Sequence, residues 1–410
     1  MVLTALGMIV LLLMAGLGVD VGYLRYQKQQ MQKAADAGAL AGAAAVIAYS
    51  GGVAQQQIIT AARADAAANG FTDGQNGISV TVNHPPLTNN DPFLNDPRYV
   101  EVIVAQQRPT FFMRLLGYRS VNVASRAVAT SVGSGSGCFY ALDPTDPHTF
   151  VVDAGSTISS NCGVLIASSS TSAFEAGAGA NVTARSIGVV GDCDGAGCGG
   201  LSTQPTNNIA PFTDPLANVP SPPAPSPGCY KTGFTVTGGT AHLDPAGNYC
   251  GGINLTGGTI TLSPGTYYLV GGGLNVSANA TVTGSGVTFF NTAGNGYSYE
   301  PINLIGSSNT NISAPVDAGN SLAGILIFQD RSIRNNTAQN IVDASNGQVF
   351  TGTLYFPTTA LKYRGAPLLL NPYELLIAWK LEFQGRTQIN NHYDTLPNGA
   401  SPIRNATLVE

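Results

Sequence analysis

The stretches FTVTGGTAHL (residues 234–243), INLTGGTITL (residues 253–262) and LNVSANATV (residues 274–282) carry one pattern at almost equal intervals. Apolar residues alternate with polar ones in each copy, and glycine or asparagine at the centre allows a tight bend. Five further copies begin at Phe150, Ala173, Ile302, Ile341 and Leu381. A recurrence of about 20 residues is typical of stacked β repeats. We expect a right-handed parallel β-helix over residues 138–400, with an antiparallel sandwich as the alternative.

Segments of different composition interrupt and follow the repeats. Residues 203–228 are rich in proline, and we expect them to form an extended insertion along the outside of the repeats. Residues 401–410 are expected to form a C-terminal tail.

All six cysteines lie in one window inside the repeat region. They are Cys138, Cys162, Cys193, Cys198, Cys229 and Cys250. An even number, without the spacings of a zinc or haem site, predicts three disulfides formed in an oxidising compartment. Among the fifteen possible pairings we favour the three between sequence neighbours.

A different pattern opens the chain. The segment from Met1 to Val19, MVLTALGMIVLLLMAGLGV, carries no charge, and helical periodicity continues without proline to Ala48. We expect residues 1–49 to form a long hydrophobic helix, pilin-like or transmembrane, because such a run is long enough for a hydrocarbon core. No cation precedes Arg25, and whether a leader precedes Met1 stays open. We expect Asp20, which is costly in lipid, to lie at the interface or to meet a cation such as Arg25 of a neighbour.

Small residues recur along this helix at a spacing that brings them to one face. Gly18 and Gly22 are four residues apart, as are Gly38 and Gly42. Such spacing lets a second helix approach closely. The helix is therefore expected to pack against copies of itself or against other pilins, with a monomeric membrane anchor as the alternative.

At the end of this helix the sequence resembles a known family. The stretch GLGVDVGYLRYQKQQMQKAADAGALAGAAA (residues 16–45) is similar to the N-terminal signature of TadG-like (Tad/Flp-type) pilus-assembly proteins, which are relatives of type IV pilins. The most specific part of the match is Ala34, Ala35, Asp36 and the run from Ala39 to Ala43. The resemblance implies a pilus system. One departure is Ala5, where pilins that assemble by the usual route carry glutamate.

The segment between helix and repeats is expected to be a small α/β domain over residues 50–133. Its pattern predicts a helix, two strands, a short helix and a third strand. These are Val53–Asn69, Ile78–Asn83, Tyr99–Gln106, residues 109–117 and residues 121–132. We expect the aromatic pair Phe111 and Phe112 to be core.

Composition and motifs argue against several kinds of chemistry. Only 10% of residues are charged and the net charge is −5, so the composition shows no excess of positive charge for binding nucleic acid. Parallel β-helix enzymes line a groove with carboxylates and cations, and the repeats offer few. Asp192 and Asp194 are too few for a calcium site, and we expect Asp330 and Arg331 to be a structural ion pair or a loop anchor. We expect no catalytic residue, metal or cofactor.

These observations predict a non-enzymatic structural subunit of an extracellular pilus-like filament. The N-terminal helix would pack in the filament core after a stage in the inner membrane, and the β-helix head would be displayed outside for adhesion, with a surface glycan as an open partner. The alternatives are a membrane-anchored minor pilus component or adhesin, and a tethered carbohydrate-active enzyme or lectin.

Overall fold

The computed structural model of the chain separates into two compact units. Unit 1 comprises Met1–Ser134 and Ile403–Glu410, and unit 2 comprises Gly135–Pro402. The structure describes residues 2–48, 55–97, 99–130, 137–223, 226–277, 279–306, 310–317, 319–334, 337–344, 348–365, 373–396, 401–403 and 407–409. Within the first helix it describes the side chains of residues 14–46.

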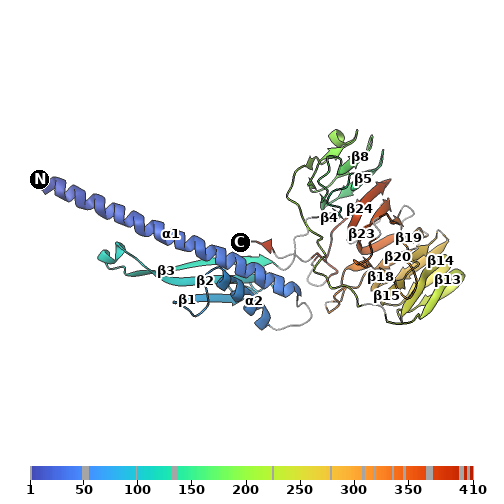
Figure 1. Cartoon of the computed structure of the whole chain (residues 1–410), viewed down its shortest axis with the longest axis horizontal. Coiled ribbons are helices and arrows are strands. Elements are labelled where there is room, and N and C mark those ends of the chain that lie inside the picture. Colours follow the sequence, from blue (N-terminus) through green and yellow to red (C-terminus); the bar gives the residue numbers. More distant parts are fainter. Residues whose placement is uncertain are drawn as a thin grey trace. The chain divides into compact units, whose positions relative to one another are not determined.

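Unit 1 is an antiparallel sheet with two helices packed on it (Figure 1). Its elements are α1 (Val2–Ala48), α2 (Gln55–Ala68), β1 (Ile78–Asn83), β2 (Tyr99–Pro109), the 3-10 helix η1 (Met113–Leu116), β3 (Ser120–Thr130) and β26 (Thr407–Leu408). The strand order is β1-β2-β3-β26. The strands and helices predicted for the middle segment are confirmed, with η1 shorter than the expected helix.

The second half of α1 packs on the sheet because its inner face is made of small side chains. Ala34, Ala35 and Ala39 are fully buried against α2 and the strands. At Gly42 a Cβ atom would lie 2.8 Å from Val100 Cγ1, so only glycine allows this approach. α1 is therefore a packed part of unit 1.

The expected hydrophobic character of the N-terminal helix is not what the structure has. The helix is continuous from Val2 to Ala48, as predicted. The part whose side chains are described carries the charged residues Asp20, Arg25 and Lys28 among its apolar ones. No helix within the described ranges is long and apolar enough to cross a membrane.

Unit 2 consists of short and long strands that pair in parallel. The strands are β4 (Gly137–Ala141), β5 (Phe150–Val152), β6 (Thr157–Ser160), β7 (Gly163–Ile166), β8 (Phe174–Ala176), β9 (Asn181–Thr183), β10 (Ile187–Val189), β11 (Cys193–Asp194), β12 (Pro205–Thr206), β13 (Lys231–Leu243), β14 (Asn248–Leu262), β15 (Gly265–Val270), β16 (Leu274–Val276), β17 (Ala280–Gly284), β18 (Val287–Thr292), β19 (Ile302–Leu304), β20 (Asn311–Ser313), β21 (Ile325–Gln329), β22 (Gln339–Asp343), β23 (Val349–Arg364), β24 (Glu374–Gln384) and β25 (Arg386–Ile389). A short 3-10 helix, η2 (Cys198–Gly200), follows β11. All these strands except β6, β9 and β25, which form a separate sheet, belong to one 19-stranded sheet.

The pairing register follows the sequence repeats. Phe234 is the partner of Ile253, and Ile253 is the partner of Leu274. At the other end of the unit, Leu381 pairs with Phe150, and Phe150 pairs with Phe174. The repeat starts Phe234, Ile253 and Leu274 are therefore neighbours, whereas Ala173 and Ile341 are each displaced by one residue from the start of the adjacent repeat.

The order of the strands departs from the order of the chain. β24 pairs with both β4 and β5, so the last long strand of the unit lies beside the first two. From β4 the pairing runs through β7 and β10 to β12. After residue 230, β13 pairs with β14, and further parallel pairs lead to β23 and β24.

The expected fold class, α+β with a long hydrophobic N-terminal helix and a right-handed parallel β-helix, is therefore wrong. The chain is mainly β, with two α-helices among its described residues. Unit 2 contains a 19-stranded sheet, whose strand order is not the chain order, and a separate sheet of β25, β6 and β9. The physical reason is that the period of the repeats shows which residues are equivalent but not which strands are neighbours. β24 pairs with β4 and β5, which come from the opposite end of the sequence of unit 2.

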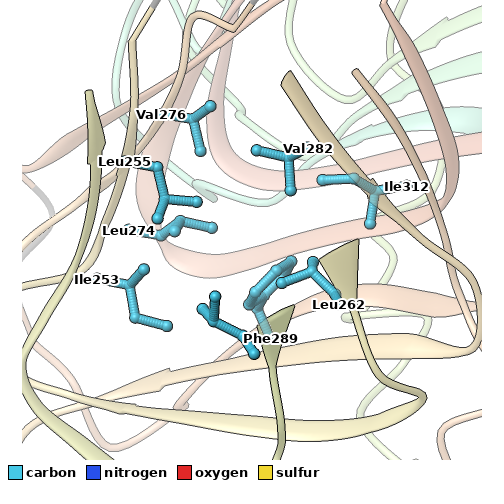
Figure 2. Close-up of a pocket in the computed structure, with 9 residues that line it drawn as sticks. Ile253, Leu255, Leu262, Leu274, Val276, Val282, Phe289 and Ile312 are labelled. Carbon is cyan, nitrogen blue, oxygen red and sulfur yellow. The ribbon is translucent and has the colours of Figure 1, made fainter. Parts of the chain in front are cut away.

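The interior of unit 2 is a packed apolar core. Figure 2 shows side chains of β14, β16, β17 and β18 converging between the strands. The space they line leaves no room for a water molecule. The lining residues are Leu243, Ile253, Leu255, Leu262, Leu274, Val276, Val282, Phe289 and Ile312. This interior is packing and not a ligand cavity.

The proline-rich insertion is bonded to unit 2, and its first part, β12, pairs with β10 in the sheet. Arg331 holds it: Nη2 donates to Leu216 O at 2.6 Å and Nη1 donates to Val219 O at 3.0 Å. The guanidinium also stacks on Tyr355, 5.2 Å from the ring centre. Further on, Asn248 Nδ2 donates to Gly228 O at 2.8 Å. Arg331 is thus the loop anchor that the sequence suggested.

Candidate functional site

The candidate site lies in unit 1, where the connection between β2 and β3 meets α1. We call residues 109–120 the tip. Inside the tip, Thr110 N donates to Arg119 O at 3.1 Å, and η1 ends at Gly117, whose φ of 93° suits glycine. The tip is therefore an ordered turn that continues the β2–β3 ladder.

Asp20 fixes the tip to α1. Its carboxylate accepts hydrogen bonds from three consecutive backbone N–H groups: Phe111 N at 2.7 Å, Phe112 N at 2.8 Å and Met113 N at 2.6 Å. Unpaired N–H groups at a helix start favour such an acceptor. The Asp20 side chain is fully buried, and this burial raises its pKa; the three donors outweigh burial and bring the pKa below the ordinary value.

This arrangement gives Asp20 partners that the sequence did not suggest. The sequence predicted a place at the membrane interface or a cation such as Arg25 of a neighbouring chain. The structure gives it partners in its own chain, in the connection between β2 and β3.

Two aromatic contacts add to the attachment of the tip. The rings of Tyr23 and Phe111 meet edge to face, with centroids 5.2 Å apart. Phe112 lies over Gly16, where a Cβ atom would come within 2.6 Å of the ring. The tip is therefore held against residues 16–23 of α1.

The outer side of this region exposes large apolar side chains. Leu115 and Leu116 are 73% and 60% exposed, and Phe111 and Phe112 are 51% and 41% exposed. The prediction that the Phe111–Phe112 pair is core is therefore wrong. Further exposed residues of the same region are Met14, Leu17, Val19, Val21, Tyr26 and Tyr118. Contiguous exposed apolar residues of this kind mark interaction surfaces.

The four glycines predicted for helix assembly fall into two pairs. Gly18 and Gly22 have open space around them, with no atom within 4 Å of an added Cβ. A Cβ atom added at Gly38 would lie 3.0 Å from Ala62 O, and one added at Gly42 would lie 2.8 Å from Val100 Cγ1, so both glycines serve packing inside unit 1. Only the first pair is accessible to another helix.

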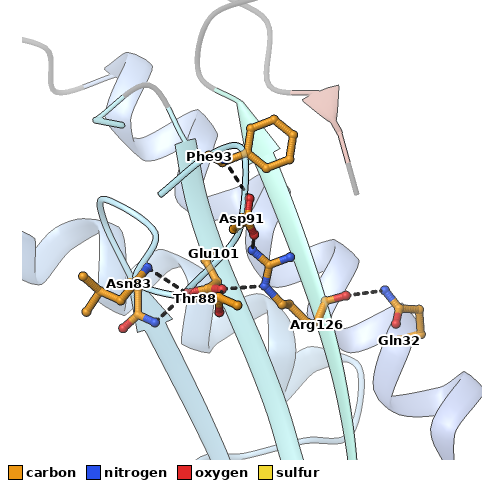
Figure 3. A network of polar contacts seen from close by, with 8 residues as sticks. Gln32, Asn83, Thr88, Asp91, Phe93, Glu101 and Arg126 are labelled. Atoms are coloured by element: carbon orange, nitrogen blue, oxygen red, sulfur yellow. Dashed lines mark hydrogen bonds and ion pairs between the residues drawn. The ribbon is translucent and has the colours of Figure 1, made fainter. Parts of the chain in front are cut away.

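The opposite part of the same sheet is organised by a buried carboxylate (Figure 3). Glu101 is fully buried and pairs with Arg126, which also pairs with Asp91. Further donors to Glu101 are Asn83 Nδ2, Leu87 N and Thr88 Oγ1. Gln32 of α1 donates to Arg126 O at 2.9 Å, which ties this network to the helix. The β2–β3 hairpin is thus attached to α1 at both ends.

The six cysteines lie in unit 2 and form the three pairs favoured by the sequence. Cys138 is bonded to Cys162, Cys193 to Cys198 and Cys229 to Cys250. The three bonds close short loops, with sequence separations of 24, 5 and 21 residues.

The two acidic side chains beside Cys193 in unit 2 have structural roles. Asp192 accepts a hydrogen bond from Cys193 N at 2.7 Å, and Asp194 accepts one from Gly195 N at 2.7 Å, so both carboxylates serve a turn. Across the described residues, no group of three or more His, Cys, Asp and Glu side chains is placed to hold a metal ion.

Sequence reasoning missed the tip. The string FFMRLLGY has the composition of a buried segment, and alternation alone does not tell which side of a hairpin end is covered. One signal was present: Arg114 and Arg119 interrupt the apolar residues within six positions, which is unusual for core.

Comparison with known proteins adds one finding. Residues 1–45 match the family model described as putative Flp pilus-assembly TadE/G-like. This region is α1 almost to its end and includes Asp20 and all four glycines, and the match associates the chain with pilus assembly and with the pilus or cell surface. No curated protein and no solved structure matches the chain significantly.

Proposed function

We propose that this chain is a non-enzymatic structural subunit of an extracellular pilus-like filament. α1 joins the subunit to copies of itself or to other pilins, and unit 2 is the part displayed outside for surface contact. The observation that carries the proposal is the family match on α1, because the same helix has an uncovered stretch around Gly18 and Gly22.

The two halves of α1 suit two different tasks. From about Met31 onward its small side chains are buried against its own sheet. Around Gly18 the helix is open, and the neighbouring side chains of Met14, Val19 and Val21 are exposed. Glycine at this spacing lets helix backbones approach closely, which is how helices without large side chains gain packing energy.

The disulfides and the anchored insertion support a structural role for unit 2. Three covalent cross-links constrain the unfolded chain, and Arg331 attaches the insertion to the sheet. Such a unit suits exposure outside the cell, where oxidising conditions keep disulfides intact.

The test is electron microscopy of surface fractions and of the purified full chain. The wild type is expected to form fibres. The Gly18→Leu/Gly22→Leu variant is expected to stay monomeric, because leucine keeps the helix but prevents close approach. Ala44→Leu is the matched control, since Ala44 is an exposed position on the same helix. Fibres from the double variant, or monodisperse wild-type monomers and no fibres, would contradict the proposal.

A further inference from the structure

The tip combines exposed apolar side chains with an ordered backbone. Phe111, Phe112, Leu115, Leu116 and Tyr118 are all exposed and lie close together in the sequence. A surface of this kind normally costs solubility unless a partner covers it.

The position of the tip along α1 is fixed by contacts. Asp20 accepts its three N–H groups, Tyr23 packs on Phe111, and Gly16 accommodates Phe112. The uncharged run from Met1 to Val19 ends at this same level. The tip therefore lies beside the point where α1 changes from uncharged to charged sequence.

Positive charge is concentrated in this region. The stretches 14–31 and 106–123 contain five cationic residues and a single acid, Asp20, whose carboxylate is covered by backbone donors. The cationic residues are Arg25, Lys28, Arg108, Arg114 and Arg119. The whole chain has a net charge of −5, so the distribution is strongly uneven.

The excess of positive charge around the apolar side chains favours a lipid partner. Aromatic residues and arginine are also enriched in protein interfaces, but five cations with a single acid that is already hydrogen-bonded match the apolar groups flanked by lysine and arginine in segments that lie in a lipid headgroup layer. Cationic clusters next to apolar sequence also attract anionic lipids.

We propose that the tip inserts into the headgroup layer of an anionic phospholipid bilayer, with Phe111, Leu115 and Leu116 in the acyl boundary and Arg114 and Arg119 on the phosphates. This interaction goes beyond the filament role and does not depend on it. The tip and the open face of α1 would then have separate roles, because Gly18 and Gly22 have no contact with the tip.

The experiment places a fluorescent reporter in the tip of the full chain. In a Trp379→Phe background, which removes the single native tryptophan, Leu115→Trp is compared with Leu87→Trp. Leu87 is the matched control because it is 59% exposed in unit 1 but lies on the loop tied to Glu101. The vesicles contain phosphatidylglycerol and phosphatidylcholine with brominated acyl chains.

The tryptophan of Leu115→Trp is expected to shift to shorter wavelength and to be quenched by shallow bromines, and that of Leu87→Trp is not. Arg114→Gln and Arg119→Gln, introduced with Leu115→Trp, are each expected to weaken the effect about fivefold, and salt is expected to weaken it further. Both arginines are exposed, and circular dichroism checks that the variants fold.

Three results would overturn the proposal: no quenching at position 115, equal quenching at positions 115 and 87, or equal quenching by pure phosphatidylcholine vesicles. A change at position 115 that follows protein concentration instead of lipid would assign the tip to a protein interface. Fibre formation by the arginine variants is measured separately, so failure of the lipid proposal and failure of the filament proposal can be distinguished.

Discussion

Alanine substitutions at Gly18 and Gly42 separate the two kinds of glycine in α1. Replacing glycine by alanine in a helix interior stabilises it by about 1 kcal/mol. At Gly18 the added methyl group meets nothing, so the Gly18→Ala variant is expected to gain up to about this amount. At Gly42 the methyl group would lie 2.8 Å from Val100 Cγ1. Overpacking of this kind costs about 1–3 kcal/mol.

The helix propensity term is common to both variants and cancels in their difference. Gly42→Ala is therefore expected to be less stable than Gly18→Ala by about 1–3 kcal/mol in the free energy of unfolding. The assay is urea unfolding followed by far-ultraviolet circular dichroism, because both α-helices of the described chain lie in unit 1. Fluorescence of Trp379 reports unit 2 in the same samples and is expected not to change.

Equal stability of the two alanine variants would refute the assignment of Gly42 to internal packing. A loss of stability at Gly18 would refute the assignment of Gly18 to open surface. Either result would remove the distinction on which the assembly role of the first glycine pair depends.

Three further predictions follow from other contacts. Gly16→Val is expected to detach the tip, because the added Cβ would lie 2.6 Å from the Phe112 ring. Trypsin should then cleave after Arg114 faster than it does in the control Gly22→Val, where the space around the glycine is open. Arg331→Met is expected to lower the stability of unit 2 by roughly 3 kcal/mol through the loss of charge-assisted hydrogen bonds to the insertion; unchanged Trp379 unfolding would contradict this. Burial raises the pKa of Tyr140 and Tyr299 to about 12. The folded state therefore keeps these protons after the unfolded chain has lost them near its ordinary pKa of about 10, and stability should fall between these two pH values. Tyr140→Phe and Tyr299→Phe should flatten that fall, and an unchanged slope would argue against burial as its cause.

The sequence predicted local features well because their causes are local. β1 was predicted to the residue from alternation, and α2 was predicted to within two residues at its N-terminus and one at its C-terminus. The disulfides follow the nearest pairing, since each closes a short loop. The register of Phe234, Ile253 and Leu274 followed from the repeat.

Features that depend on distant contacts were beyond the sequence. The partners of Asp20 lie far along the chain, beyond β2, so its carboxylate looked unpaired when only its neighbours were considered. The exposure of Phe111 depends on how the hairpin meets α1, and composition does not contain that information. The pairing of β24 with β4 likewise has no signal in the period of the repeats, which is why the fold class was wrong.

The most direct test of the central claim, that the open face of α1 joins the subunits, is site-specific photo-crosslinking in fibres. A benzophenone amino acid is placed at Val19, which is 55% exposed beside the open glycines, and at Leu87 as an equally exposed control. The account predicts covalent products between subunits from position 19 and none from position 87. Crosslinks from position 87 alone, or none from either position in intact fibres, would contradict it.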